Sequence, residues 1–344
     1  MRVLFDVVHP AHVHFYRNLI GELGAAGDDL VVVSRHKDVT VELLDRLEIE
    51  HVPIGTPGGA GRVGQASELM TRDAKLARLV RSFRPDLVCT RNPSGVHAAL
   101  ARRSTISIFD TDDGAAAGLH YRLASIADVI TMPDALTPTR PARTHQYPSY
   151  KALAYLHPDR FTPDPGIRVE LGVGDEPLFI IRLVAMAASH DHGESGLDAV
   201  TRRGLVEMLA SRGRLFISSE SVLPAELEQY QIPLGPDRLH DLLATADLYV
   251  GDSQTVATEA ALLGTPTLHV SSWSRRLDLL VELEDRFGLL RSFTPDDTQI
   301  LAVADGLSAD PSQVRLQWKE GRDRMLAERI DLTSWYLDLM RALV

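Results

Sequence analysis

Three histidines stand in the six residues HPAHVH, at positions 9–14, directly after the apolar run VLFDVV. Imidazole is a common metal ligand, and with an unperturbed pKa of about 6.5 it is also well suited to proton transfer at neutral pH. The three histidines alone do not decide between these chemistries. The residues that lie near these histidines in the fold are needed to distinguish metal binding from proton transfer.

A second stretch with chemical character is GDSQTVATEAALLGTPTLHV, in which an apolar strand pattern changes into a helix pattern. Free N–H groups and the positive end of the helix dipole favour a phosphate at such a helix start. Ser253 and Thr255 add hydroxyl donors, and Glu259 is near enough to accept hydrogen bonds from ribose hydroxyls. In the alternative interpretation, Asp252 or Ser253 only caps the helix.

Arg182 stands near the end of PLFIIRL, the first strand pattern of the second half. The carboxyl ends of parallel strands meet at one edge of a sheet, so we expect Arg182 to face the same site as Asp252. Its planar guanidinium suits a diphosphate, whereas the alternative is a surface arginine paired with a carboxylate. In the adjacent residues His190-Asp191-His192 not all three can face one metal ion, so we expect a loop with His190 as a candidate ligand contact.

Short β-rich runs alternate with amphipathic helical patterns, which predicts βαβ units and parallel sheets covered by helices on both faces. The expected strands are nearly continuous in apolar residues, as strands buried on both faces are. They are residues 2–7, 29–34, 50–55, 86–90, 105–110 and 128–132 in the first half, and 177–183, 213–218, 247–252 and 265–271 in the second.

At 344 residues the chain is too long for one ordinary core, so two domains are expected. A segment rich in Pro, Thr and aromatic residues after the last strand of the first half predicts a crossover between them. We expect an N-terminal domain at residues 1–150, a hinge at 151–176 and a C-terminal domain at 177–311. Helices at 312–344 are expected to pack back across the hinge.

The composition excludes several classes of protein. A formal net charge of −11 argues against nucleic-acid binding. The single cysteine, Cys89, lies in the apolar run DLVCT and is expected to be a buried thiol in a reducing compartment. The sequence contains no run of about eighteen apolar residues, which a membrane-spanning helix would need. A strand pattern begins at residue 2, where a signal peptide would otherwise stand, so we expect a cytoplasmic protein.

The segment D-S-Q-T-V-A-T-E-A-A-L-L-G-T-P resembles the nucleotide-binding segment of GT-B glycosyltransferases and of UDP-N-acetylglucosamine 2-epimerases, although the Gly-Gly common in that turn is missing. The resemblance implies two Rossmann-like, doubly wound α/β domains facing across a cleft, with a C-terminal helix returning to the first domain. It implies that Ser253, Gln254 and Thr255 hold the diphosphate and Glu259 the ribose. Arg182 and Asp252, placed at the same strand ends, complete the predicted nucleotide-binding set. Asp278, after the last strand, becomes a candidate contact to sugar hydroxyls.

The N-terminal half is similar to the lipid-acting N-acetylglucosaminyltransferase of peptidoglycan synthesis, through VLFDVVHPAHVHFYRNLI and the acceptor-side segment IFDTDDGAAAGLHYRLASIADVIT. Here His-Pro-Ala replaces the glycines of its first loop. The acceptor contacts implied are His9, His14, Asp113 and Lys151. Residues 1–310 also resemble a prokaryotic family of unknown function within the GT-B group, marked by D-x-x-H-P-A-H-x-H-F, Y-P-S-Y-K-x-L-A-Y-L-H and E-A-A-L-L-G-T-P.

Inverting sugar transfer needs one base for the acceptor proton and donors for the departing diphosphate. His12 is the predicted base, because a helix start lowers the pKa of an imidazole and keeps it neutral. Asp6 on the first strand, or Asp110, Asp112 or Asp113 from the next strand end, could orient it, and Asp110 and Asp112 are counted with the catalytic residues. GT-B enzymes do this without a bound metal, so no cofactor is expected.

The metal interpretation of the histidines rests on another resemblance. His12-Val13-His14 resembles the H-x-H start of metal-dependent hydrolases built on (β/α)₈ barrels, which need further His and Asp ligands at later strand ends. The later strand ends here give Arg35, Arg91, Asp110, Arg182 and Asp252, a set too basic for a zinc site. A catalytic or acceptor-binding histidine is therefore favoured, a structural cluster at a helix start is the alternative, and a metal site is the least favoured interpretation.

The favoured function is a glycosyltransferase that moves a sugar from a nucleotide diphosphate sugar, with a UDP-sugar as the preferred donor. The alternative is a UDP-sugar 2-epimerase, but Arg91-Asn92 in DLVCTRNPSG do not match the epimerase carboxylates. A nucleotide-sugar-binding regulator without activity is a third interpretation. A lipid-linked or polysaccharide acceptor is expected, and the basic-apolar helix AKLARLVRSF could touch the inner membrane face, unless it only covers the core. The oligomeric state is not predicted.

Overall fold

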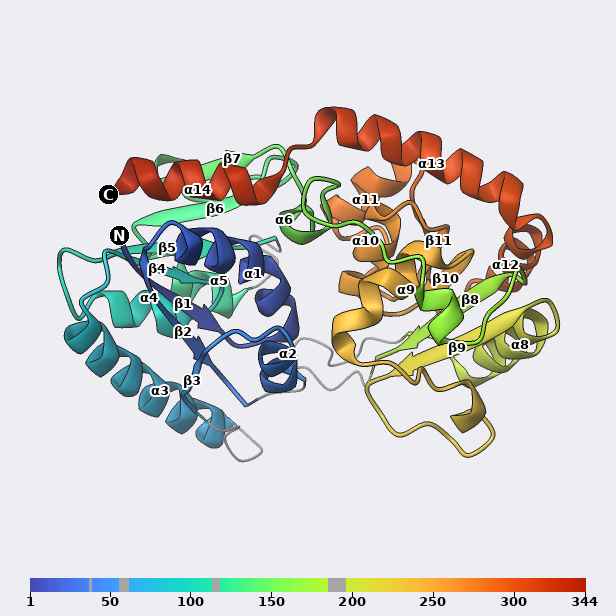
Figure 1. Ribbon diagram of the computed structural model, residues 1–344, viewed down its shortest axis with the longest axis horizontal. Coiled ribbons are helices and arrows are strands. Elements are labelled where there is room, and N and C mark those ends of the chain that lie inside the picture. The colour runs from blue at the N-terminus through green and yellow to red at the C-terminus, as the bar shows by residue number, and fades with distance from the viewer. Residues whose placement is uncertain (37–38, 56–61, 113–117, 185–195) are drawn as a thin grey trace. The chain divides into compact units, whose positions relative to one another are not determined.

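The computed structural model describes residues 1–36, 39–55, 62–112, 118–184 and 196–344, with the backbone alone for residues 62–69. The chain divides into two compact units. Unit 1 consists of Met1–Arg160 and Arg329–Val344, and unit 2 of Phe161–Glu328. Each unit is an α/β structure with one parallel sheet (Figure 1), which confirms the predicted fold class.

Unit 1 holds a seven-stranded sheet in the order β3-β2-β1-β4-β5-β6-β7, with all neighbouring strands parallel. Its strands are β1 (Arg2–Val7), β2 (Asp29–Ser34), β3 (Val52–Pro53), β4 (Leu87–Thr90), β5 (Ile106–Asp110), β6 (Val129–Pro133) and β7 (Thr144–Tyr147). Its helices are α1 (Pro10–Ala25), α2 (Thr40–Arg46), α3 (Arg62–Phe83), α4 (Pro93–Ala99), α5 (Leu119–Ala124), η2 (Pro141–Arg143), α6 (Leu153–Leu156) and α14 (Leu332–Leu343).

The core of unit 1 explains why the apolar runs form its central strands. One cluster joins side chains of β1, β2 and β4 to the buried stripes of α3 and α4: Leu4, Val33, Val88, Leu76, Val80, Ala98 and Ala99. Val3 and Phe5, which alternate with Leu4 along β1, are buried as well. Strands covered on both faces need apolar residues at every position, and β1 and β4 have them almost throughout.

Unit 2 holds a five-stranded parallel sheet in the order β12-β11-β10-β8-β9. Its strands are β8 (Leu178–Leu183), β9 (Arg214–Ser219), β10 (Leu248–Gly251), β11 (Thr267–Val270) and β12 (Arg291–Phe293). Its helices are α7 (Ile167–Glu170), α8 (Ala199–Ala210), η3 (Glu228–Tyr230), η4 (Pro236–Arg238), α9 (Leu239–Thr245), α10 (Gln254–Leu262), α11 (Asp278–Asp285), α12 (Ile300–Ala309) and α13 (Pro311–Glu328).

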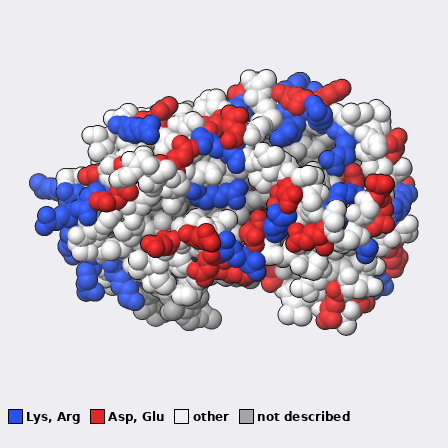
Figure 2. Space-filling view, in the orientation of Figure 1, with Lys and Arg blue, Asp and Glu red and all other residues white. Residues whose placement is uncertain are grey.

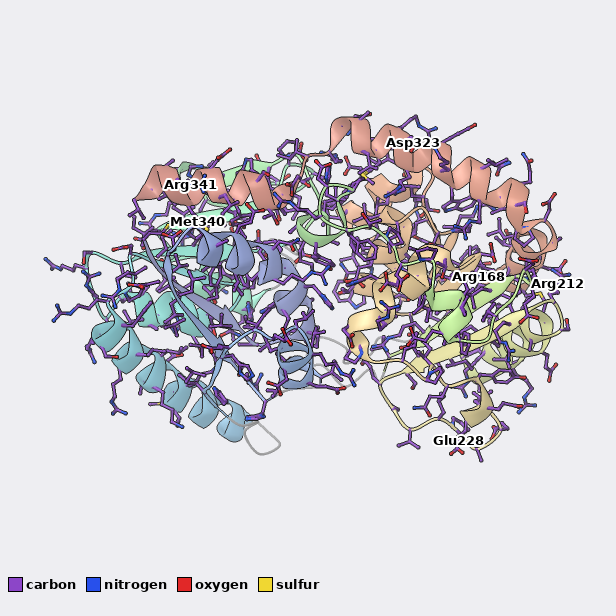
Figure 3. The ribbon with its side chains drawn as sticks, viewed as in Figure 1. Arg168, Arg212, Glu228, Asp323, Met340 and Arg341 are labelled. Carbon is purple, nitrogen blue, oxygen red and sulfur yellow. The ribbon has the colours of Figure 1, made fainter. Side chains whose placement is uncertain are left out.

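The last two helices belong to different units. Helix α13 lies in unit 2, where the indole N–H of Trp318 donates to the Leu289 carbonyl at 3.0 Å. Helix α14 returns to unit 1 and packs against α1 and α6. Its amphipathic pattern accounts for this, because Met340 is fully buried whereas the next residue, Arg341, is exposed (Figure 3).

Two edge strands were not predicted, and one is shorter than predicted. β7 lies in the Pro-rich segment after β6, β12 has three residues, and β3 pairs with β2 over two residues only. Such edge strands carry no long apolar run that a sequence pattern could show. No helix in the described part of the chain is long and apolar enough to cross a membrane. Basic and acidic side chains both occur over each unit on the face in Figure 2.

Candidate functional sites in the two units

The sheet of unit 1 has a switch point between β1 and β4. From β1 the chain runs outward through β2 to β3, and it then returns to β4 on the other side of β1. Ligands of open α/β sheets bind beyond the carboxyl ends of the strands at such a point. The segments that follow these two strands are HPAH, which opens α1, and Arg91-Asn92, which precedes α4.

The first turn of α1 satisfies its own backbone donors. Pro10 has no N–H, the Ala11 N–H donates to Nδ1 of His9 at 3.2 Å, and the His12 N–H donates to the His9 carbonyl at 2.9 Å. His9 therefore caps the helix with its side chain. A substrate at this edge of the sheet has to be bound by side chains, because these amides already have acceptors.

Arg91 organises the charged groups at this point. Its guanidinium forms ion pairs with Asp110 and Asp112, and Nζ of Lys151 lies 2.6 Å from the second oxygen of Asp112. The Arg91 side chain is 7% exposed and lies over the Phe15 ring. Burial would raise the pKa of Asp112, but Arg91 and Lys151 together hold it well below its usual value. Arg91 was not among the predicted site residues, although it directly follows a buried strand.

Asp110 lies deeper than its predicted catalytic role suggested. One carboxylate oxygen accepts hydrogen bonds from Thr131 at 3.0 Å, Tyr147 at 3.1 Å and Tyr336 at 2.7 Å. The other oxygen faces Arg91, and the residue is 2% exposed. This carboxylate fixes the position of Arg91. Tyr336 comes from α14, so the returning C-terminal helix supports the site.

His12 lies half-buried beside this cluster. Its Nδ1 accepts a hydrogen bond from the Val8 N–H at 3.4 Å, and its ring centroid is 6.0 Å from that of His9. Burial lowers the pKa of His12 well below its usual value, and the charges of Arg91, His9 and Lys151 lower it further against the opposing effect of Asp112. The ring is therefore neutral at physiological pH.

His14, a predicted acceptor residue, and Asp6 are not part of this cluster. His14 is buried, its ring stacks on Tyr155 at 5.3 Å, and Arg17 lies 3.4 Å from its Nδ1. These contacts hold α1 against α6, which is a packing role. Asp6, a candidate orienting group, is fully buried and bonds to Arg72 and Thr90 instead. Asp113 lies outside the described residues.

The sheet of unit 2 has its switch point between β8 and β10, where Arg182 and Asp252 come together. The Asp252 N–H donates to the Arg182 carbonyl at 3.3 Å. The Arg182 guanidinium, however, is already hydrogen-bonded within unit 2. Its Nη1 donates to the hydroxyl of Ser218 on β9, and its Nη2 donates to the carboxylate of Glu220, which follows β9, at 2.7 Å. Glu220 was not predicted as a partner, although an arginine paired with a carboxylate was the alternative interpretation.

The start of α10 differs from the start of α1. Ser253 is the N-cap, and its hydroxyl accepts from the Val256 N–H at 3.3 Å. Across the ranges that the structure describes, the Gln254 and Thr255 N–H groups have no hydrogen-bond acceptor. Both residues are half-buried. The cap interpretation thus holds for Ser253, and two helix-start donors remain for an anion.

Glu259 is directed into unit 2. It is 3% exposed, and its Oε1 lies 3.4 Å from Nε2 of His240 on α9. His240 was not predicted, because no motif connects LHDLL with the segment of Glu259. Asp278 is exposed at the first position of α11, and His190 lies outside the described residues.

Asp252 gives a testable pH dependence. Burial raises its pKa to about 6, although its carboxylate accepts from the Val184 N–H at 2.8 Å. A folded pKa above the unfolded value of about 3.9 means that the ionised form opposes folding above pH 6, and that this cost disappears on acidification. Asp252→Asn keeps an acceptor for Val184. We expect it to stabilise the protein at pH 8 by about 1–2 kcal/mol and to have little effect at pH 4. Urea unfolding at both pH values measures this, and an equal effect at both would contradict it.

The fold is one that solved enzyme structures share. Two parallel-sheet α/β units are the fold of GT-B glycosyltransferases and UDP-N-acetylglucosamine 2-epimerases. The chain belongs to the family described as protein of unknown function (DUF354), whose model matches residues 1–282. No curated protein sequence matches the chain.

Solved structures match the whole chain at low sequence identity. The complex of MnaA from S. aureus with UDP has a TM-score of 0.68 and 11% identity, covering 100% of this chain and 97% of that one. The spinosyn forosaminyltransferase SpnP has a TM-score of 0.66 and 16% identity, covering 100% and 99%. The UDP-GlcNAc 2-epimerase from Neisseria meningitidis bound to UDP-GlcNAc has a TM-score of 0.62 and 13% identity, covering 95% and 98%.

Proposed function

We propose that this protein is a glycosyltransferase that uses a nucleotide diphosphate sugar, with UDP as the favoured nucleotide, and transfers the sugar to an acceptor held by unit 1. The observation that carries the proposal is the start of α10, where the Gln254 and Thr255 N–H groups have no acceptor among the described residues. Two such donors at the positive end of a helix suit a phosphate. Neighbours of the same fold were solved with UDP and with UDP-GlcNAc bound.

In this proposal unit 2 binds the nucleotide. Gln254 and Thr255 hold the diphosphate, with the Thr255 hydroxyl as a further donor. Arg182 reaches the diphosphate only if it exchanges Glu220 for phosphate oxygens, and Glu259 reaches the ribose only if it leaves His240. The amide donors are therefore the firmest part of the proposed nucleotide site, and Asp252 and Ser253 shape the turn that presents them.

A UDP-sugar 2-epimerase is the second candidate, because several neighbours of the fold are described as UDP-N-acetylglucosamine 2-epimerases. That reaction needs carboxylates near C2 of the sugar. In unit 1 the carboxylates of Asp110 and Asp112 are both paired with Arg91, and Lys151 engages Asp112 as well. Carboxylates bound in this way are poor bases, which favours transfer over epimerisation.

The acceptor is proposed to bind beside His9, His12 and Lys151, and a lipid-linked or polysaccharide acceptor remains the proposal from the sequence. Inverting transfer without a bound metal is likewise part of the proposal. Sugar hydroxyls or a phosphate group would find imidazole, guanidinium and ammonium donors there, since Arg91 and Lys151 lie in the same cluster.

The proposal is tested by thermal shift against UDP, GDP, CDP, ADP and their common sugar conjugates, with and without EDTA. A ligand that binds only the folded state at 100 times its Kd stabilises it by about 2.7 kcal/mol, which is a readily measured rise in Tm. We expect a rise with one nucleoside diphosphate that EDTA does not change. A loss of Tm with EDTA and no response to any nucleotide would overturn the proposal in favour of a metalloprotein.

Glu259→Ala tests the ribose contact in the same assay. If Glu259 leaves His240 and accepts from ribose hydroxyls, its removal weakens nucleotide binding by about 1–3 kcal/mol, measured by calorimetry at a temperature where the variant is folded. Glu207→Ala is the matched control, because that carboxylate is exposed on α8 of the same unit and has no part in the proposed site. Equal affinity of wild type and Glu259→Ala would assign Glu259 to the internal pair with His240.

A further inference from the structure

The two histidines at the start of α1 share one hydrogen-bonding arrangement. In His9 and in His12, the ring nitrogen Nδ1 accepts a hydrogen bond from a backbone N–H, that of Ala11 at 3.2 Å and that of Val8 at 3.4 Å. A neutral imidazole carries one proton, and the nitrogen that accepts a hydrogen bond is the one without it. Both rings, when neutral, therefore carry their proton on Nε2.

This arrangement is the opposite of what a general base at Nε2 requires. Such a base has its lone pair on Nε2 and its proton on Nδ1, and an acceptor, commonly a carboxylate, holds that proton. Here Nδ1 of His12 meets an N–H donor, and the carboxylates near it are bound elsewhere: Asp6 by Arg72, Asp110 and Asp112 by Arg91. Within the described part of the chain, Nε2 of His12 has no hydrogen-bond partner and is not sealed in the core.

Burial keeps the His12 ring neutral, and the charges around it add to this effect and favour an anion beside the ring. Arg91 and Lys151 are cationic neighbours, His9 is a polar neighbour on the same helix start, and the carboxylate of Asp112 acts in the opposite direction. The balance of these groups disfavours a second proton on the ring. The same positive field stabilises a negatively charged oxygen at Nε2.

We propose that His12 is a neutral Nε2–H donor that binds an anionic oxygen of the substrate, a phosphate or carboxylate oxygen, and that it does not remove the acceptor proton. The proposal rests on the proposed function in that unit 1 is taken to bind a substrate. An acceptor whose attacking oxygen is already ionised needs no general base, and a donor aimed at that oxygen orients it for attack. The substrate class assigned to unit 1 is therefore an acceptor with an ionised phosphate or carboxylate group.

The position of the ring proton can be measured without any activity assay. Protein labelled with ¹⁵N at histidine is studied by long-range ¹H–¹⁵N correlation at pH 7, in which Nε2 is recognised because it couples to both ring carbon protons. The signals of His12 are assigned by their loss in His12→Gln, and the exposed His145 serves as the internal reference. We expect a protonated Nε2 and an unprotonated Nδ1. A proton on Nδ1, or a doubly protonated ring, would overturn the proposal.

Inorganic phosphate then tests the ligand class in the same spectra. We expect the Nε2–H signal of His12 to shift and saturate with phosphate, while Nδ1 stays unprotonated and His145 does not respond in parallel. An unchanged His12 signal at high phosphate would overturn the assignment of an anionic oxygen. These readouts are independent of the nucleotide screen, so a failure of the transferase proposal and a failure of this inference are distinguished.

Discussion

Arg91→Met is expected to destabilise the protein by about 3–5 kcal/mol at pH 7, because it leaves two carboxylates at a buried position without their shared cation. Asp110 is 2% exposed, and among the described residues Asp112 keeps the ion pair with Lys151. Methionine fills much of the space of the arginine stem over the Phe15 ring, so the loss reports on charge more than on packing. Urea unfolding followed by circular dichroism measures the change in the free energy of unfolding.

The control is Arg46→Met, which removes an arginine paired with Glu42 on the surface of α2. An exposed pair of this kind contributes about 0.3–0.5 kcal/mol, so the control is expected to unfold almost like wild type. If Arg91→Met were as stable as this control, the charged cluster would not be the organising centre of the unit 1 site.

Acidification should have opposite effects in wild type and in Arg91→Met: it should remove the stability that Asp112 contributes in wild type, and it should reduce the stability deficit of the variant. In wild type the pKa of Asp112 is depressed, so its contribution to stability is present above the unfolded value of about 3.9 and is lost as the pH falls below it. In Arg91→Met the pKa of Asp112 should rise, because the guanidinium no longer offsets the effect of burial. The deficit of the variant should therefore shrink between pH 7 and pH 4. A constant deficit would assign the loss to packing.

The sequence predicted the central strands well because strands buried on both faces consist of nearly continuous apolar residues, and such runs are visible in the sequence. RVLFDV and DLVVVS are strands with the predicted bounds, and DLVCT and TISIFD differ from the observed strands by one residue at the start. β7 escaped prediction because the run THQY is largely exposed and pairs with β6 alone. Edge strands are specified by their neighbours in space, which no local pattern contains.

For the candidate sites, the sequence predicted which residues lie at one edge of a sheet, but not which side chains contact each other. Strand ends determine which residues share an edge, so the sequence predicted that His12, Asp110 and Asp112 belong to one site, and in the structure they lie around Arg91 together with Lys151. The partner of each side chain was not predictable. Glu259 lies against His240, because the pairing depends on how α9 and α10 pack. The position of a single backbone N–H likewise determines which nitrogen of an imidazole accepts a hydrogen bond. The spacing of residues in the sequence does not specify that position.

His12→Ala is expected to lower turnover by about 10²–10³-fold, the usual cost of losing one donor to a reacting oxygen. The assay uses the donor that the thermal-shift screen identifies. Nucleotide affinity should stay within twofold of wild type, because the proposed nucleotide donors, the Gln254 and Thr255 N–H groups, belong to unit 2. A large loss of nucleotide affinity would show that His12 belongs to the nucleotide site and that its assignment to the reacting oxygen is wrong.

His12→Gln separates the two chemical roles that this histidine can have. A glutamine amide offers an N–H group near the position of Nε2, but it has no basic nitrogen, so it replaces a donor and not a base. If His12 donates, the glutamine variant should turn over at least about 10-fold faster than His12→Ala, since a hydrogen bond to a charged oxygen, worth roughly 1.5 kcal/mol or more, is restored. If His12 is the base, both variants lose the proton acceptor and should be equally slow. His14→Gln is the matched control, because that ring stacks on Tyr155 and lies outside the cluster of Arg91.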